Sequence, residues 1–201
     1  MKGQNNLFVI IFVLIVIAMI GVFFIINYNG LVISEKVVEE SQAQIATVLK
    51  RRLSLIPNLV QIVKGYAEHE KDTLIAVTQA RTNAVNTLKS LGSDGGYTKK
   101  DILKLQVSQT QLDGAIKGIF ALVENYPSLK ASSNFMALQD QLEGTENRIA
   151  VARQRYNVAV RVFNSKVETF PGVFIAPMFG FSEKGFFETE AKSYEDIEIE
   201  F

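Results

Sequence analysis

Residues 133–170 read SNFMALQDQLEGTENRIAVARQRYNVAVRVFNSKVETF, and their apolar positions recur in steps of three and four. This spacing lines one face of an α-helix and is typical of antiparallel helices that cross at about 20°. We therefore predict a long helix that begins at Ser132 or Ser133, since either serine can act as an N-cap, and that ends at Phe170. The apolar face comprises Phe135, Leu138, Leu142, Thr145, Ile149, Ala152, Tyr156, Val160, Phe163, Val167 and Phe170.

Three earlier segments show the same helical periodicity. The first contains Pro57, where the missing N–H predicts a kink or a local break in hydrogen bonding. The second covers about residues 70–91 and the third about residues 99–124, with a glycine-rich loop between them. Four amphipathic helices with short connections predict an all-α protein in which residues 29–170 form an elongated antiparallel four-helix bundle.

One segment ahead of the bundle is long enough to cross a membrane. Leu7–Ile26 contains 20 residues without a charge, which at about 1.5 Å per residue spans about 30 Å, the thickness of a hydrocarbon core. The other interpretation is a cleaved signal peptide, but the apolar region of such peptides is usually about 7–15 residues long and ends in small residues. Here residues 27–30 read NYNG. We predict a transmembrane helix over residues 7–26, preceded by a short flank of residues 1–6.

The charges that flank this segment indicate its orientation. Lys2 and the α-amino group precede it, whereas Lys36 stands among three glutamates after it. Because basic residues favour the cytoplasmic side, we expect the N-terminus inside and the bundle outside the cytoplasmic membrane. The bias rests on one lysine and leaves the opposite orientation open.

The composition excludes several classes of protein. The 201 residues include 21 basic and 21 acidic side chains, so the chain lacks the basic surplus that nucleic-acid binding requires. The chain has no cysteine, which excludes thiolate catalysis and cysteine metal sites, and its one histidine, His69, excludes a multi-histidine metal centre. We predict no cofactor, no metal, no catalytic residue and no nucleic-acid partner, hence a protein that is not an enzyme.

Polar residues interrupt or flank the apolar faces at a few positions. Arg52 stands where an apolar residue would continue the stripe of the first helix, and Glu146, Arg153, Asn157 and Asn164 follow one side of the last helix. In one interpretation they form a buried network that fixes helix register, with Arg52 paired with a carboxylate such as Glu146. The other is a di-iron carboxylate site, but the Glu-x-x-His motif that it needs is absent from the sequence. We favour the network.

The C-terminal extension, residues 171–201, has a different composition. Its first part is rich in proline and glycine, and we predict a non-helical segment that packs on the bundle or contacts a neighbouring subunit or the membrane. The candidate contact residues in this part are Phe174, Phe179, Phe181, Phe186 and Phe187.

The end of the extension alternates apolar and acidic residues. Ile197, Ile199 and Phe201 would share one face of a strand over residues 194–201. Since an isolated strand is not stable in water, this segment is either without fixed structure or pairs with a strand of another chain.

Several blocks of the sequence resemble the bacterial LemA family, and together they extend over about residues 7–187. The first blocks are Lys50-Arg51-Arg52, Leu55-Ile56-Pro57-Asn58-Leu59-Val60, Val63-Lys64-Gly65-Tyr66, His69-Glu70 and Ala76-Val77-Thr78-Gln79-Ala80-Arg81. The later blocks are Tyr126-Pro127-Ser128-Leu129-Lys130-Ala131, Leu142-Glu143-Gly144-Thr145-Glu146-Asn147-Arg148-Ile149, Ala152-Arg153, Tyr156-Asn157 and Phe170-Pro171. The resemblance implies a protein of the bacterial cytoplasmic membrane with an N-terminal membrane helix, a helical bundle and no established enzymatic activity. Relatives in this family are associated with membrane organisation, including magnetosome formation.

These observations lead to two hypotheses about function. The first is a non-enzymatic membrane-anchored scaffold that self-associates as a homo-oligomer and organises membranes or membrane-protein partners, held in the lipid bilayer by residues 7–26. The second is a sensor or adaptor that binds a partner protein or peptide in a groove of the bundle.

Overall fold

The computed structural model describes residues 2–91 and 96–187, in which six helices and no strand occur. Within these residues the predicted all-α class is confirmed, whereas the predicted strand over residues 194–201 lies outside them. The helices are α1 (Lys2–Tyr66), α2 (Lys71–Ser90), α3 (Lys99–Val123), α4 (Pro127–Lys130), α5 (Ser133–Glu168) and α6 (Gly172–Met178).

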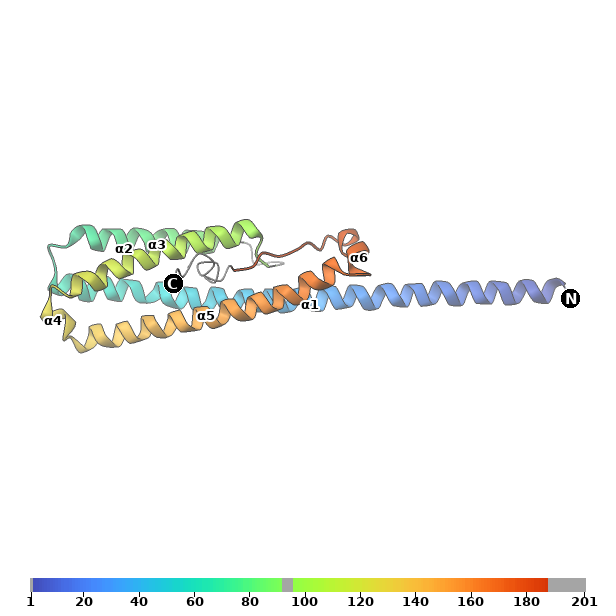
Figure 1. The fold of residues 1–201 in the computed structure, drawn as a ribbon, viewed down its shortest axis with the longest axis horizontal. Coiled ribbons are helices and arrows are strands. Elements are labelled where there is room, and N and C mark those ends of the chain that lie inside the picture. Colours follow the sequence, from blue (N-terminus) through green and yellow to red (C-terminus); the bar gives the residue numbers. More distant parts are fainter. Residues whose placement is uncertain (1, 92–95, 188–201) are drawn as a thin grey trace, which may run out of the picture.

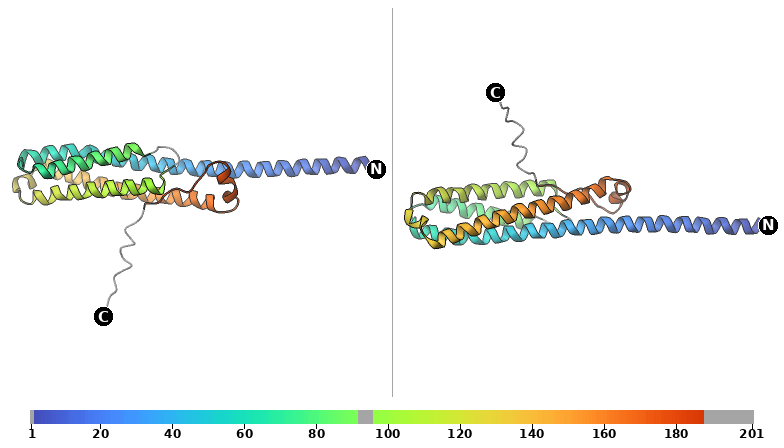
Figure 2. Two further views of the ribbon diagram at one scale, coloured as in Figure 1. Left: turned by 90° about the horizontal axis from the view of Figure 1, so that it is seen from above. Right: turned by 60° about the horizontal axis from the view of Figure 1, so that its bottom comes forward.

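Four long helices, α1, α2, α3 and α5, lie side by side along one axis (Figure 1). Helix α1 packs against α5 and α2, and α2 packs against α3. The short helix α4 makes the turn from α3 to α5 at the end remote from the N-terminus, while α6 follows α5 and folds back beside α1 (Figures 1 and 2). The N-terminal part of α1 extends beyond the other helices (Figure 2).

By length and composition, α1 is the one helix of the described residues that could cross a membrane. Its large apolar side chains from Ile10 to Ile26 are mostly exposed, as expected of a surface that faces lipid. The helix passes through residues 27–30 without a break, because one glycine costs a helix only about 1 kcal/mol. The apolar segment and the packed part of α1 therefore form one continuous helix.

Helix α1 also continues through Pro57, which lacks the N–H that would bond to the carbonyl oxygen of Leu53. Arg81 of α2 takes the place of that donor, since its Nε lies 3.0 Å from the Leu53 oxygen. The guanidinium thus satisfies a carbonyl that the proline leaves without its helical partner.

The predicted apolar stripes meet in two main groups of buried side chains. The distal core surrounds Ile56 and Ile119, near the α4 turn, and the proximal core surrounds Leu49, Tyr156 and Phe163, nearer the apolar segment. A small third group joins Leu31 of α1 to α6.

The prediction that the first part of the C-terminal extension is non-helical is wrong for α6. Pro171 is the N-cap of this helix, and Pro177 lies near its end, where its absent N–H removes a single bond from a helix of 7 residues. Phe174 therefore lies on a helix, whereas Phe179, Phe181, Phe186 and Phe187 follow it in a segment without regular structure.

Candidate functional site

A layer of polar side chains separates the distal core from the proximal core. We define the polar layer as Arg52 of α1, Gln109 and Asp113 of α3, and Glu146 of α5. The Nη2 atom of Arg52 lies 2.5 Å from Asp113 Oδ1 and 3.1 Å from Glu146 Oε2. Arg52 thus joins α1 to both α3 and α5, between the two cores.

Burial within the polar layer is uneven. The side chain of Arg52 is 8% exposed, while those of Asp113 and Glu146 are 35% and 50% exposed. Two half-hydrated carboxylates therefore neutralise a buried cation without being fully desolvated themselves. Asp113 could not be singled out from the sequence, because it directly follows Leu112 and lies at the margin of the apolar face of α3.

Three buried polar atoms of the layer have no hydrogen-bond partner within the described residues. These are the Nε of Arg52 and both amide atoms of Gln109, whose exposed fraction is 2%. A buried polar group that makes no hydrogen bond costs about 1–3 kcal/mol. The unpaired atoms of the polar layer therefore lower the stability of the fold.

Two asparagines of α5 bind the C-terminal segment (residues 179–187) rather than joining the polar layer. Asn164 accepts a hydrogen bond from the Lys184 N–H at 2.9 Å and donates one to the Lys184 carbonyl at 3.0 Å. Asn157 makes the same pair of bonds to Phe187, at 2.9 and 2.8 Å. Each side-chain amide thus pairs with both backbone groups of one residue.

The spacing of the two asparagines matches the segment that they bind. Asn157 and Asn164 are seven residues apart on a helix, which separates them by about 10 Å. Lys184 and Phe187 are three residues apart, which in extended chain is also about 10 Å. The segment runs antiparallel to α5 at this register.

The end of the C-terminal segment completes an aromatic cluster. The Phe187 ring, which is buried, packs edge-on against Tyr97 and Tyr156, and the Arg153 guanidinium lies 5.5 Å from its centroid. The Tyr156 hydroxyl accepts a hydrogen bond from the Tyr97 N–H at 3.0 Å. Burial, and secondarily the nearby Asp101, raises the pKa of Tyr97 to about 12, and burial raises the pKa of Tyr156 further.

Gly185 and Lys184 also hold the C-terminal segment against the neighbouring helices. Gly185 donates its N–H to the Tyr97 carbonyl at 2.8 Å, and a Cβ at this glycine would lie 2.8 Å from the backbone nitrogen of Lys99. Lys184 forms an ion pair with Glu35 of α1 at 2.9 Å. The C-terminal segment therefore connects α5, α3 and α1.

The candidate contact residues of the C-terminal extension fall into different environments. Phe187 is buried and Phe181 is half-buried, whereas Phe174, Phe179 and Phe186 are exposed. The other three candidates, Ile197, Ile199 and Phe201, lie outside the described residues. Part of the extension thus packs on the bundle, and part leaves aromatic rings uncovered.

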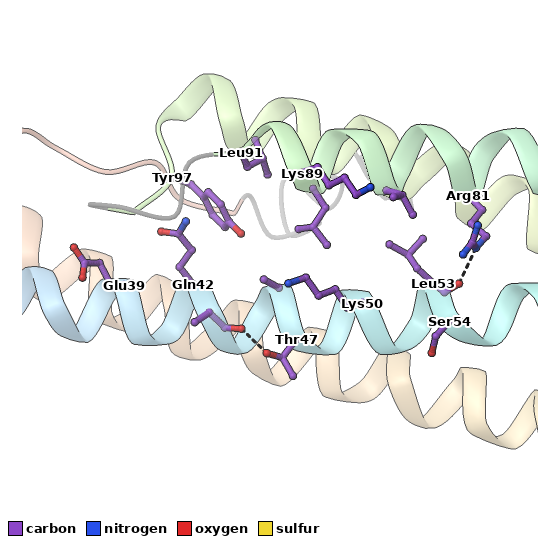
Figure 3. A pocket seen from close by; sticks show the side chains of 14 residues that line it. Glu39, Gln42, Thr47, Lys50, Leu53, Ser54, Arg81, Lys89, Leu91 and Tyr97 are labelled. Atoms are coloured by element: carbon purple, nitrogen blue, oxygen red, sulfur yellow. Dashed lines mark hydrogen bonds between the residues drawn. The ribbon is translucent and has the colours of Figure 1, made fainter.

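A groove of about 670 Å³ lies between α1 and α2 (Figure 3). Lys50, Arg81 and Lys89 line it together with Glu39, and Leu53 and Tyr97 contribute apolar surface. Its lining carries more positive than negative side chains. No group of three or more acidic or histidine side chains that could hold a metal ion occurs among the described residues. His69 lies exposed in the turn between α1 and α2 and does not line the groove.

The sequence matches a known protein family over most of its length. The sequence model of the LemA family matches residues 41–201. The chain belongs to the LemA family. The match begins within the part of α1 that packs against the other helices and includes the polar layer and both asparagines of α5.

Similar proteins occur in different bacteria, and two of them serve as examples. Magnetosome protein MamQ 2 of Paramagnetospirillum magneticum is 25% identical over 201 residues, which cover 93% of this chain and 74% of that protein. Protein LemA of Metamycoplasma hominis is 28% identical over 162 residues, which cover 79% of this chain and 69% of that protein. Neither name denotes an enzymatic activity.

Proposed function

We propose that this LemA-family protein is a non-catalytic scaffold whose elongated four-helix bundle, formed by α1, α2, α3 and α5, is anchored to a membrane by the apolar segment of α1. The observation that carries the proposal is that Lys2–Tyr66 is a single helix, so anchor and bundle share one rod. A continuous helix bends only gently, and the position of the bundle relative to the bilayer follows from that of the anchor. Such a connection suits a protein that holds partners in place at a membrane.

The relatives support a role in membrane organisation. Three of the similar proteins are named magnetosome proteins, two from Paramagnetospirillum magneticum and one from Magnetospirillum gryphiswaldense. We extend to this chain the general role, that of arranging components at a membrane, and propose that it acts as a homo-oligomer. The exposed Phe186 and the alternating residues 194–201 are the surfaces that we propose for contact between copies.

Self-association is tested on the full-length chain in mild detergent. Size-exclusion chromatography with light scattering should give a mass of several copies, and removal of residues 194–201 should reduce it. A single copy before and after the deletion contradicts the scaffold. Protease added to intact cells and to spheroplasts tests the orientation that the flanking charges favour, since a bundle outside the cytoplasmic membrane is cut once the outer barrier is removed.

The groove between α1 and α2 favours a second candidate, an adaptor. Its basic and apolar lining fits an extended peptide with acidic and apolar side chains. In that case the chain is monomeric alone, a peptide of this composition binds it, and Lys50→Glu with Lys89→Glu abolishes the binding. Matched replacement of Lys104 and Lys117, exposed on α3, leaves binding unchanged.

A further inference from the structure

Helix α6 is apolar on all sides. Ile175 and Ala176 are buried against Leu31 of α1. The opposite face is uncovered, with exposed fractions of 68% for Phe174 and 70% for Met178. We define the outer face of α6 by its exposed apolar residues, Phe170, Val173, Phe174, Met178 and Phe179.

The stretch of chain that carries this face adds no charge. Between Glu168 and Glu183 the chain contains 14 consecutive residues without a charged side chain. A helix that is hydrophobic all round is normally buried in protein or in lipid, and a soluble surface rarely keeps such a patch uncovered. The outer face of α6 therefore has the character of an interaction surface for an apolar partner.

The position of α6 along α1 identifies what covers it. The Phe179 ring lies 4.7 Å from that of Tyr28, and Lys166, close before α6, donates a hydrogen bond to the Gly30 carbonyl at 3.1 Å. Tyr28 and Gly30 are two and four residues beyond Ile26, the end of the apolar segment, and hence about 3 and 6 Å along the helix. The headgroup layer on each side of a hydrocarbon core is about 5–8 Å thick. Helix α6 thus lies at the height of the headgroups of a bilayer that α1 crosses.

We propose that the outer face of α6 inserts into the interfacial layer of the same bilayer that anchors α1. This inference rests on the anchor of the proposed function, and adds a second attachment beside it. The apolar face of an interfacial helix binds at about this depth with a strength that scales with its buried apolar area, and α6 has no charge that opposes insertion. Two contacts with the membrane, unlike one, restrict the tilt of α1 and the bundle relative to the bilayer.

The absence of cysteine from the chain allows a direct test of depth. Single cysteines at Leu14, Met136 or Met178, all exposed, carry an environment-sensitive fluorophore. Each full-length variant is placed, one copy per disc, in nanodiscs of phosphatidylcholine and phosphatidylglycerol with spin-labelled lipid as quencher. Leu14 reports the anchor, Met178 reports α6, and Met136, near the opposite end of α5, is the matched control.

The expected result is strong quenching at 14, clear quenching at 178 by lipids labelled near the headgroup, and none at 136. Quenching at 14 without quenching at 178 overturns the inference and leaves the anchor intact. If the label at 178 is shielded only when two copies share a disc, a second copy covers α6 and the inference is also wrong. Absence of quenching at 14 contradicts the proposed function itself.

Phe174→Ser with Met178→Ser provides the complementary measurement. Both side chains are exposed, so the double variant should keep its thermal unfolding temperature in detergent. With the fluorophore at position 173, its quenching by lipid should fall several-fold relative to the parent. Unchanged quenching shows that the outer face does not drive the contact.

Discussion

The Arg81 guanidinium donates to the Leu53 carbonyl at 3.0 Å, the oxygen that Pro57 deprives of its helical partner. This hydrogen bond ties α2 to α1 at the carbonyl whose helical donor is missing because of the proline (Figure 3). A side chain from a different helix thus completes the backbone hydrogen bonding of the helix that leads to the membrane.

Replacing Arg81 by Met should lower the free energy of unfolding by about 1–2 kcal/mol, because the buried Leu53 carbonyl loses its donor. In the Pro57→Ala background the same replacement should cost markedly less, since residue 57 then supplies an N–H. Chemical unfolding of the four proteins in detergent gives the coupling energy. Arg148→Met, at an exposed position of α5, is the control. Equal costs in both backgrounds would contradict the compensation.

The two carboxylates that neutralise Arg52 should be partly redundant. Either Asp113→Ala or Glu146→Ala leaves one partner for the guanidinium, so each should cost about 1 kcal/mol. The double replacement strands a buried charge and should cost about 3–5 kcal/mol, more than the sum of the single changes. Asp140→Ala on the exposed side of α5 serves as control. Simple additivity would show that the two acids do not share Arg52.

Gln109 should be replaceable by Met with a gain in stability. Its amide is buried without a hydrogen bond among the described residues, and a thioether of similar volume removes that cost. We expect a rise of about 1 kcal/mol in the free energy of unfolding, whereas Gln111→Met on the exposed face of α3 should change little. Destabilisation by Gln109→Met would mean that the amide contributes to the fold.

The asparagines of α5 should control the C-terminal segment locally. Asn164→Asp keeps the acceptor for the Lys184 N–H but removes the donor to the Lys184 carbonyl. Hydrogen exchange should accelerate at residues 182–187 and stay unchanged in the distal core. Asn147→Asp, exposed on the same helix, controls for the added charge. Acceleration throughout the bundle would indicate a global rather than a local effect.

How far the sequence predicts this structure depends on the kind of interaction. Periodicity places α2, α3 and α5 within about two residues, because apolar burial repeats regularly along a helix. It also marks Arg52 as an interruption of an apolar stripe. It does not reveal that Asn157 and Asn164 bind backbone, since a peptide group has no sequence pattern of its own. The sequence does not predict α6, because Pro171 and Pro177 indicate a break in helical structure. Proline is nevertheless tolerated near the ends of a short helix.

The aromatic cluster predicts a loss of stability in alkali. Tyr97 ionises with a pKa of about 12 in the folded protein, because burial disfavours the phenolate, against about 10 in the unfolded chain. Below pH 10 both states keep the proton and the group has no effect. Between pH 10 and 12 the folded state binds more protons than the unfolded state, so stability falls as pH rises, by up to about 1.4 kcal/mol per pH unit for this tyrosine.

Tyr97→Phe removes this group from the titration, and the decline in unfolding free energy between pH 10 and 12 should become shallower than in the parent. The variant loses the phenol that interacts with Gln42, so its stability at neutral pH falls, and only the slope is compared. Tyr66→Phe, which removes an exposed tyrosine of α1, is the matched control. Chemical unfolding in detergent at a series of pH values, together with the ultraviolet absorbance of tyrosinate, measures both quantities. If Tyr97→Phe and Tyr66→Phe change the slope equally, the buried phenol is not the origin of the alkaline loss.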